Sequence, residues 1–418
     1  MAMAETKADR PLLDLSDPRF LADPYPFYRL LRERAPVWRS PTGLWVLSRH
    51  SDIAAVLKDP RFGHDFEGKL SDPRERSDLL EEPVFRGLRL SMLVRDPPDH
   101  TRLRGLVAKA FTARRLEAMR PKIAALVEAL LDAVEPQGRM DAIADFARPL
   151  PVLVICDLLG IPEADRPRFL GGYRVSGRAL DPTPMTREEL DEVNAIAVRN
   201  RGYFEDLFER RRDAEGDDLI SALLHVRDEH DGRLTHDELA ANIGLLFGAG
   251  HETTTHLIGN GLLALHRNPD QWRKLVADPM LAGNAVEELL RFDSSVQLTS
   301  RKAFEDATLD GTILRRGESV MCLLGAANRD PEVYADPEKL DITRAGVRAI
   351  SFGGGIHHCL GAQLARIEGE IVFRRLAQRL PKLTLEDKEH PTWKPTITLR
   401  GLTRLPARWD QESEVRYQ

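Results

Sequence analysis

The chain has 418 residues, of which 42% are hydrophobic and 30% are charged, as in an ordinary globular protein. Its 60 Lys and Arg against 66 Asp and Glu give a net charge of −6, which excludes a general attraction to nucleic acid or to an anionic membrane. Three widely spaced cysteines are too few for a disulfide framework, a four-thiolate zinc site or an iron–sulfur cluster.

The sequence carries neither an export signal nor a membrane span. Residues 1–12 lack an apolar run, and no stretch approaches the ~20 apolar residues of a spanning helix. The small number of cysteines fits a reducing compartment. We therefore expect a soluble, cytoplasmic protein, with a flexible tail over residues 1–12.

The rest of the chain predicts mainly helices with small sheets. Turn residues mark the hairpins, and apolar spacing marks the helices. The expected elements, in chain order, are a hairpin of residues 36–39 and 44–47, helices over 100–111 and 122–134, a long helix from Thr235 to Asn268, a hairpin around Asp310-Gly311, a strand over 320–324, a helix from Cys359 to about Leu380, and short strands within 383–409.

The long helix decides the expected architecture. Thr235 and Glu238 have the spacing of a capping box, and Asn268-Pro269 ends the helix. At roughly 1.5 Å per residue it spans about 48 Å, and it is apolar on several sides, so it should be buried. No linker and no internal repeat divides the sequence. We expect one domain over residues 13–418, although the length alone would suggest about three.

A glycine-rich segment leads into the third cysteine. Residues 352–361 read FGGGIHHCLG, with a helix expected from Cys359 onward. Free N–H groups and the positive end of a helix dipole stabilise a thiolate, and glycines let the backbone approach a flat ligand. A cysteine taken alone at such a turn has a plainer explanation, as a buried structural residue.

The full segment resembles the haem-binding loop of the cytochrome P450 family. The shared pattern is Phe-Gly-x-Gly-x-His-x-Cys-x-Gly, and it includes Phe352, Gly353, His357, Cys359 and Gly361. The resemblance implies the fold of that family, haem b as cofactor, and Cys359 as the proximal thiolate ligand of the haem iron. Such a thiolate favours O–O cleavage. Four motifs in the order of the family extend the resemblance over most of the chain.

A second motif interrupts the apolar run of the long helix. Gly248 and Ala249 are small enough for a planar group to approach, and an acid and an alcohol follow at Glu252 and Thr253. The segment resembles the oxygen-activation motif of the family, which implies that Thr253 hydrogen-bonds to dioxygen and that Glu252 helps to relay protons. The alternative is a core threonine bonded to a preceding carbonyl. A buried carboxylate weakens it, because burial is costly without a partner or a task.

A zinc-protease motif is excluded in the same segment. That motif needs two histidines four residues apart on one helix face. His251 and His256 are five apart, roughly 140° around the helix.

A third motif is a possible ion pair between Glu288 and Arg291, because side chains three residues apart on a helix meet. It resembles the Glu-x-x-Arg pair of the family. The resemblance implies that Arg344 completes a structural triad that holds the Cys359 loop in place.

The fourth set consists of cations for the haem propionates. With iron, porphyrin and thiolate charges summing to zero, the propionates leave about two negative charges inside the protein, and buried charges need partners. By the resemblance, the candidates are His100, Arg104, Arg301 and His357.

The implied function is that of a haem-thiolate monooxygenase, of the kind used in secondary metabolism. It takes dioxygen, two electrons and two protons, and hydroxylates or epoxidises a small organic substrate. No flavin or dinucleotide fingerprint is present, so we expect a separate ferredoxin or flavodoxin with its reductase. The chain is expected to act as a monomer. A basic docking patch is expected at Arg102, Lys109, Arg114 and Arg115.

Three alternatives remain open from the sequence: a peroxide-driven peroxygenase, a haem sensor or carrier without turnover, and a haem-free cysteine enzyme. The substrate itself is not revealed. By resemblance, the apolar residues proposed to line its pocket are Leu93, Leu245, Gly248, Ala249, Val296 and Leu399, and the charged segment 63–90 is expected to cap it.

Overall fold

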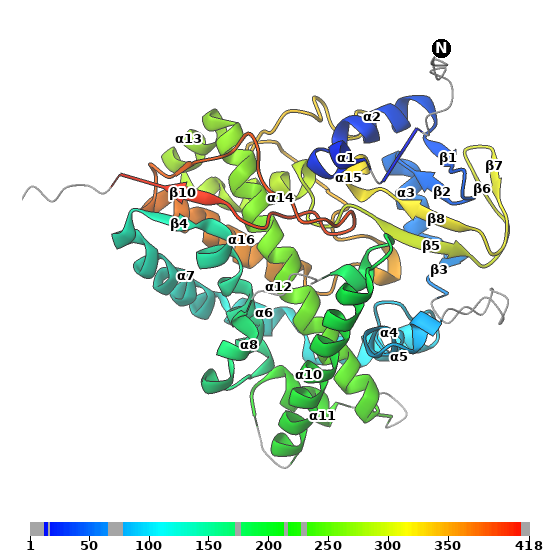
Figure 1. Ribbon diagram of the computed structural model, residues 1–418, viewed down its shortest axis with the longest axis horizontal. Helices are drawn as coiled ribbons and strands as arrows, with labels where there is room; N and C mark the ends of the chain where they lie inside the picture. The colour runs from blue at the N-terminus through cyan, green and yellow to red at the C-terminus, as the bar shows by residue number, and fades with distance from the viewer. Residues whose placement is uncertain are drawn as a thin grey trace, which may run out of the picture.

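A 32-residue helix, α12 (His236–Arg267), runs through the middle of the molecule (Figure 1). The computed structural model describes residues 12–15, 17–65, 78–171, 177–212, 216–226 and 232–410. The expected capping box is present: the Thr235 hydroxyl accepts from the Glu238 N–H, and the Glu238 carboxylate accepts from the Thr235 N–H. Nearly every residue from Glu252 to His266 is buried, so the prediction of a long buried helix is confirmed.

Further helices pack around α12 and carry most of the core. Figure 1 places α7, α8 and α16 on one side of α12 and the largest sheet on the other. The other helices are α1 (Pro18–Ala22), α2 (Tyr25–Arg34), α3 (His50–Lys58), α4 (Pro83–Arg89), α5 (Asp99–Ala110), α6 (Ala113–Ala118), α7 (Arg120–Val134), α8 (Pro149–Leu159), α9 (Pro167–Leu170), α10 (Arg187–Arg211), α11 (Leu219–His225), α13 (Pro269–Ala277), α14 (Ala282–Phe292), α15 (Leu324–Ala327) and α16 (Ala362–Arg379).

Three small sheets complete the fold. The largest has the strand order β1-β2-β8-β5-β3, in which β2 and β8 are parallel and the other pairs antiparallel. A second sheet has the order β4-β10-β9, and β6 pairs with β7. Their bounds are β1 (Val37–Arg39), β2 (Trp45–Leu47), β3 (Phe62–Gly63), β4 (Arg139–Asp141), β5 (Thr299–Ala303), β6 (Ala307–Leu309), β7 (Thr312–Leu314), β8 (Ser319–Cys322), β9 (Thr384–Leu385) and β10 (Pro406–Arg408).

Both predicted hairpins are confirmed. β1 and β2 pair across residues 40–44, and β6 and β7 pair across Asp310-Gly311. Asp310 and Gly311 both have positive φ, 47° and 74°, as a tight turn of this hand requires.

Two predicted boundaries are wrong. The strand expected over 320–324 ends at Cys322, and α15 begins at Leu324. The helix expected from Cys359 begins only at Ala362, because the Cys359 N–H donates back to the Phe352 carbonyl and closes a loop.

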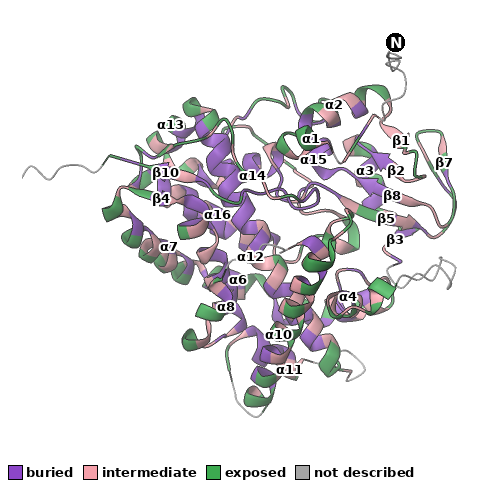
Figure 2. Cartoon of the chain, in the orientation of Figure 1, coloured by how far each residue is buried: buried purple, intermediate pink, exposed green. Residues whose placement is uncertain are grey.

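The buried side chains form one large cluster around α12, and smaller clusters lie under the largest sheet and the N-terminal helices (Figure 2). Among the described residues, no helix is both long enough and apolar enough to cross a membrane. Residues 1–11 of the expected tail and residues 66–77 of the expected capping segment lie outside the described residues.

Candidate active site

The loop before α16 turns the Cys359 sulfur toward the start of that helix. Backbone N–H groups of Gly361 and Ala362 donate to the sulfur. Gly355 has φ of +64°, and a Cβ on it would lie 1.9 Å from the Leu57 carbonyl oxygen, so no other residue fits this close approach. The expected contact of the sulfur with free N–H groups is therefore present, although the helix starts three residues later than predicted.

The surrounding protein has opposing effects on the pKa of the Cys359 thiol. Burial raises its pKa, and this effect outweighs the N–H donors and the guanidinium groups of Arg104 and Arg366, which lower it. The residue still keeps an exposed surface. The other two cysteines are fully buried, and burial raises the pKa of each thiol to about 12. Cys359 is thus the one cysteine of the three that a ligand can reach.

The three residues of the expected structural triad lie together. The Arg291 guanidinium donates to both Glu288 carboxylate oxygens at 2.7 and 2.8 Å, and Arg344 donates to Glu288 at 3.2 Å. Glu288 and Arg291 are completely buried. The Glu288 carboxylate also accepts from the backbone N–H of Asp341 at 3.0 Å.

A hydrogen-bond chain connects this triad with the Cys359 loop. Arg291 donates to the backbone carbonyl of Asn328 at 3.1 Å. The Asn328 side chain in turn accepts from the Ile350 N–H and donates to the Ser351 hydroxyl, both at 2.8 Å. Ser351 also donates to the carbonyl of Leu290 on α14 at 2.7 Å. The residues just before Phe352 are therefore fixed to the helix that carries the triad.

The four expected propionate partners converge from three elements. His100 and Arg104 lie on α5, Arg301 on β5, and His357 in the cysteine loop. The His100 and His357 ring centroids are 4.2 Å apart, and Arg104 donates to the His358 carbonyl. Burial, with the positive charge of Arg301 and Arg104 beside it, lowers the pKa of both histidines, that of His357 to about 3.

The donor set of this cluster fits an anionic cofactor. Both ring nitrogens of His100 and Nε2 of His357 are buried and have no hydrogen-bond partner among the described residues. Native proteins rarely leave such donors without partners. Two carboxylates placed here would satisfy the imidazoles and balance the guanidinium groups. The residues around Cys359 therefore fit haem, with its propionates held by this cluster.

The small residues Gly248 and Ala249 lie in the middle of α12, as expected from the sequence. Ala249 is exposed between the half-buried residues Gly248 and Gly250, and a Cβ on Gly248 would meet nothing within 4 Å. The Thr253 hydroxyl donates to the Ala249 carbonyl at 2.9 Å, the backbone bond that a core threonine makes. The neighbouring Glu252 is buried and forms an ion pair with Lys394.

The residues expected around the substrate come from four segments. Val296 and Leu399 form an isolated antiparallel bridge, so these two lie side by side. Leu245 and Gly248 lie on α12. Leu93 follows Met92, whose N–H donates to Asn242 on the same helix at 3.0 Å.

Asp181 fastens the segment after α9 to the loop that carries Leu399. Its carboxylate accepts from the N–H groups of Ile397 and Thr398 at 2.7 and 3.0 Å. The Thr398 hydroxyl donates to the Leu180 carbonyl at 3.1 Å.

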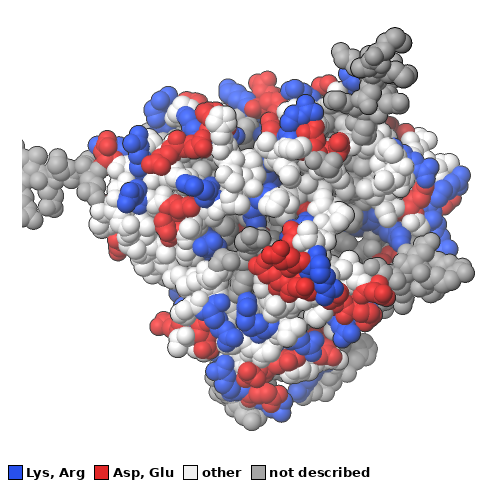
Figure 3. Space-filling model, in the orientation of Figure 1, with Lys and Arg blue, Asp and Glu red and all other residues white. Residues whose placement is uncertain are grey.

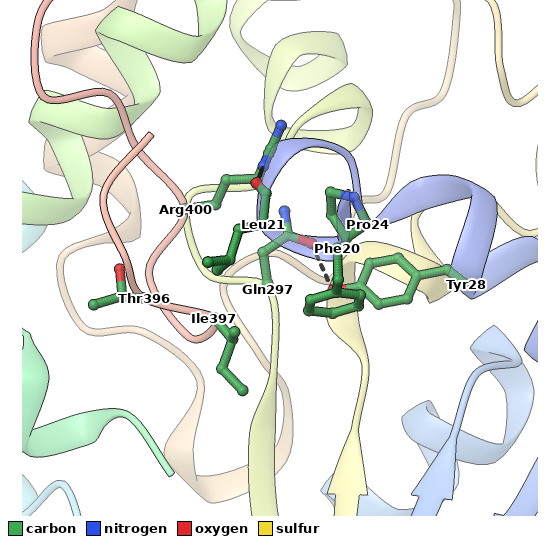
Figure 4. A pocket seen from close by; sticks show the side chains of 8 residues that line it. All are labelled: Phe20, Leu21, Pro24, Tyr28, Gln297, Thr396, Ile397 and Arg400. Carbon is green, nitrogen blue, oxygen red and sulfur yellow. Dashed lines mark hydrogen bonds between the residues drawn. The ribbon is translucent and has the colours of Figure 1, made fainter. Parts of the chain in front are cut away.

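A small pocket lies between the N-terminal helices and the C-terminal loop (Figure 4). It is lined by Phe20, Tyr28, Gln297 and Arg400 among others, and Tyr28 donates to Gln297 at 3.1 Å. Arg400 is occupied by the Asp293 carboxylate and the Leu21 carbonyl. This pocket contains no expected site residue.

The expected basic patch is only partly available. Lys109 and Arg114 are exposed, whereas Arg102 forms an ion pair with Glu238 and fastens α5 to the start of α12. Arg115 is half-buried and lies 3.6 Å from Asp217. On the face shown in Figure 3, acidic and basic side chains are interspersed.

Sequence reasoning missed two residues of the site. The His64 ring lies edge-on against the His357 ring, with centroids 4.6 Å apart, and the backbone N–H of His64 donates to the Asp96 carboxylate at 2.9 Å. Lys394 reaches Glu252 from a segment 142 residues away. Neither residue belongs to a motif, and no local spacing indicates such contacts. Among the described residues no group of three or more acidic, histidine and cysteine side chains could hold a bare metal ion.

Comparisons with known proteins agree with this geometry. The model of the family described as cytochrome P450 matches residues 182–407. Vitamin D(3) 25-hydroxylase of Pseudonocardia autotrophica is 41% identical over 409 residues, covering 97% of this chain and 98% of that protein. Cytochrome P450 monooxygenase PikC of Streptomyces venezuelae is 39% identical over 420 residues, covering 98% and 97%.

Solved structures give the same result for the fold. The crystal structure of P450BioI in complex with acyl carrier protein ligated with hexadec-9Z-enoic acid has a TM-score of 0.86. It is 38% identical, and the match covers 94% of this chain and 99% of that one.

Proposed function

This chain belongs to the cytochrome P450 family of haem-thiolate monooxygenases, and on that premise we propose that it inserts one atom of dioxygen into a mostly apolar small organic substrate. The family and the fold expected from the sequence are confirmed. The observation that best supports the proposal is the pairing of a reachable Cys359 sulfur with unpartnered imidazoles at His100 and His357.

The protein's part in the reaction begins with holding the cofactor. Cys359 would ligate the haem iron, and His100, Arg104, Arg301 and His357 would bind its propionates. Haem bound in this way supplies the activation of dioxygen. The Asn328 hydrogen bonds fix the Cys359 loop, and the small residue Gly248 on α12 leaves open space beside it.

Protons are the second contribution of the chain. The overall reaction consumes dioxygen, two electrons and two protons, and yields the oxygenated substrate and water. We assign Thr253 to holding and passing a proton at its hydroxyl, after it releases the Ala249 carbonyl, and Glu252 to proton supply. A threonine retained only as a core residue is the competing explanation.

A matched pair of substitutions tests this assignment. Thr253→Ala removes the hydroxyl next to the small residues, whereas Thr254→Ala removes a hydroxyl that donates to the Gly250 carbonyl one residue further along. We expect Thr253→Ala to keep haem and to consume oxygen with little product. Thr254→Ala should keep haem and should still couple oxygen consumption to product formation. Coupled turnover in Thr253→Ala would refute the role of Thr253.

Electrons come, in this proposal, from a separate ferredoxin or flavodoxin with its reductase. The exposed cation Lys109 lies near the end of α5, the helix that carries His100, and the exposed Arg114 lies in α6. They give a partner with an acidic surface a place to dock. A peroxide-driven reaction would need no such partner, so comparison of product yield from hydrogen peroxide and from a reconstituted redox chain separates the two.

The substrate is proposed only as a class. Val296, Leu399, Leu245 and Leu93 are apolar, and the names of the relatives refer to vitamin D(3) and to a hexadecenoic acid carried on a protein. An extended apolar substrate suits both observations. A screen of terpenoids, fatty acids, aromatics and macrolides, read by the haem spin-state shift, tests it; a response confined to polar compounds would overturn it.

A haem sensor without turnover is the second alternative. It would bind haem with the same residues, and it would show no product from any compound in that screen. A haem-free cysteine enzyme would show no haem spectrum at all.

A further inference from the structure

Three polar side chains on one face of α12 meet a hairpin near the C-terminus. Glu252, His256 and Asn260 are spaced four residues apart, which places them on one stripe of the helix. The hairpin covers residues 392–403, and its two sides join through the Trp393–Leu402 bridge. Two backbone bonds of 2.9 Å, from Lys394 to Gly401 and from Thr403 to Thr392, reinforce it.

Each polar residue of the stripe meets a different part of the hairpin. The Lys394 ammonium donates to the Glu252 carboxylate at 2.6 Å. Gly401 lies against His256 so closely that a Cβ would be 1.9 Å from Nδ1. The Asn260 amide donates to the Arg400 carbonyl at 3.0 Å. The hairpin is therefore seated on the helix along three successive turns.

The ion pair at one end of the stripe is isolated from water. The side chains of Lys394 and Glu252 are 12% and 9% exposed. Among the described residues, the Lys394 ammonium lies within hydrogen-bond distance of the Glu252 carboxylate, and the neighbouring His256 also lowers the pKa of that carboxylate. His256 Nε2 lies 3.6 Å away, beyond hydrogen-bond distance, and His251 is the other titratable neighbour. Gly177, which carries no charge, approaches the same carboxylate: a Cβ on it would lie 3.2 Å from Glu252 Oε2.

This arrangement conflicts with proton transfer from Glu252. A carboxylate that hands on a proton must first be protonated. Although burial alone would raise the pKa of Glu252, His256 and Lys394 lower it to about 2, so the group is ionised at neutral pH. The carboxylate is also directed to the hairpin, whereas Thr253 lies about 100° further around the helix.

We propose that Lys394 is the positioning residue of Glu252, keeping its carboxylate ionised and turned toward the 392–403 hairpin, so that this pair must open before Glu252 takes a proton from water and passes it on. The proposal rests on the proposed function, and it goes further by identifying the group that controls when the acid is protonated. In this proposal Lys394 acts through Glu252, the group that its ammonium contacts.

The first test follows Glu252 itself, without turnover. The carboxyl infrared band of the haem-loaded protein is recorded against pH, with Glu252→Gln subtracted to identify the band. In Lys394→Met, an uncharged side chain of similar length, the titration should move up by about 1–3 pH units, because burial then acts unopposed by the ammonium. Lys394→Arg should restore the low value. An unchanged titration in Lys394→Met overturns the proposal, whatever the activity.

The second test uses the pH profile of coupling, measured as product formed per oxygen consumed. Lys394→Met should introduce an ionisation that the wild type and Lys394→Arg lack in the same range. Lys388→Met is the matched control, because Lys388 lies just before the hairpin and donates to the His266 carbonyl, away from Glu252. Equal profiles for Lys394→Met and Lys388→Met would overturn the proposal. If the wild type forms no product, the proposed function fails while the infrared titration still decides the role of Lys394.

Discussion

The Arg291 guanidinium donates to the backbone carbonyl of Asn328, and the Asn328 side chain holds Ile350 and Ser351 at the start of the cysteine loop. A completely buried ion pair is thereby linked through Asn328 to the start of the loop that carries the proposed haem ligand. Breaking the pair should affect both stability and haem retention.

Arg291→Leu should lower the free energy of unfolding by about 3–5 kcal/mol, because it leaves the Glu288 carboxylate buried with one partner fewer. Denaturant titration of the holoprotein, with haem loss followed in parallel, measures this. Arg187→Leu is the control, because the Arg187 side chain is 72% exposed in its pair with Asp191, and it should change stability by no more than about 0.5 kcal/mol. Equal effects of the two substitutions would contradict the account.

His100→Leu should change the apoprotein and the holoprotein in opposite directions. In the apoprotein it removes two buried nitrogens without partners, and it should stabilise the fold by about 1 kcal/mol. In the holoprotein it removes a propionate donor, and haem should dissociate faster to a scavenging globin. His266→Leu provides the contrast, because both its ring nitrogens contact backbone carbonyls, at 2.8 and 3.0 Å, and its loss should destabilise the apoprotein. A destabilised His100→Leu apoprotein would count against the propionate role.

The Glu252 pair should contribute to acid sensitivity. The pKa of Glu252 falls from 4.5 to about 2 on folding. As the pH is lowered, the carboxylate is therefore protonated in the unfolded chain before it is protonated in the folded chain. The resulting stability is present above about pH 4.5 and is lost as the pH falls toward 2. Its full size is about 3 kcal/mol, at about 1.4 kcal/mol per pKa unit. Urea titrations across this range should therefore show a shallower acid loss for Glu252→Gln than for the wild type; parallel curves would argue against the low pKa.

Charge reversal at Lys109 and Arg114 should slow electron transfer from the redox partner and flatten its dependence on salt, because both side chains are exposed. Stopped-flow reduction of the haem at several ionic strengths measures the effect. Reversal at Lys382, an exposed cation beyond the end of α16, is the control. An unchanged salt dependence in the Lys109/Arg114 variant would remove these residues from the docking surface.

How much of this structure the sequence predicts depends on how far apart along the chain the interacting residues lie. The long helix, its capping box and both hairpins are local, so spacing and turn residues were sufficient. Cys359 could be recognised because the loop pattern that resembles the family lies in adjacent residues, 352–361. The start of α16 was misplaced because a backbone bond to Phe352, invisible in the pattern, keeps Cys359 in the loop.

Long-range partners were not predictable. Lys394 approaches Glu252 only because the C-terminal hairpin is seated on α12, and His64 reaches His357 through a turn fixed by Asp96. Arg102 looked like part of an exposed patch, yet Glu238 lies opposite it once α5 packs beside α12. In each case the missing information is which segments pack together.

The central claim is that Cys359 binds haem iron as a thiolate. The direct measurement is the absorption spectrum of the reduced protein with carbon monoxide, recorded for the wild type, Cys359→Ala and Cys156→Ala. The account predicts the long-wavelength Soret band of a thiolate-ligated haem in the wild type and in Cys156→Ala, and its loss in Cys359→Ala. A wild-type protein without that band, or a Cys359→Ala variant that keeps it, would contradict the account.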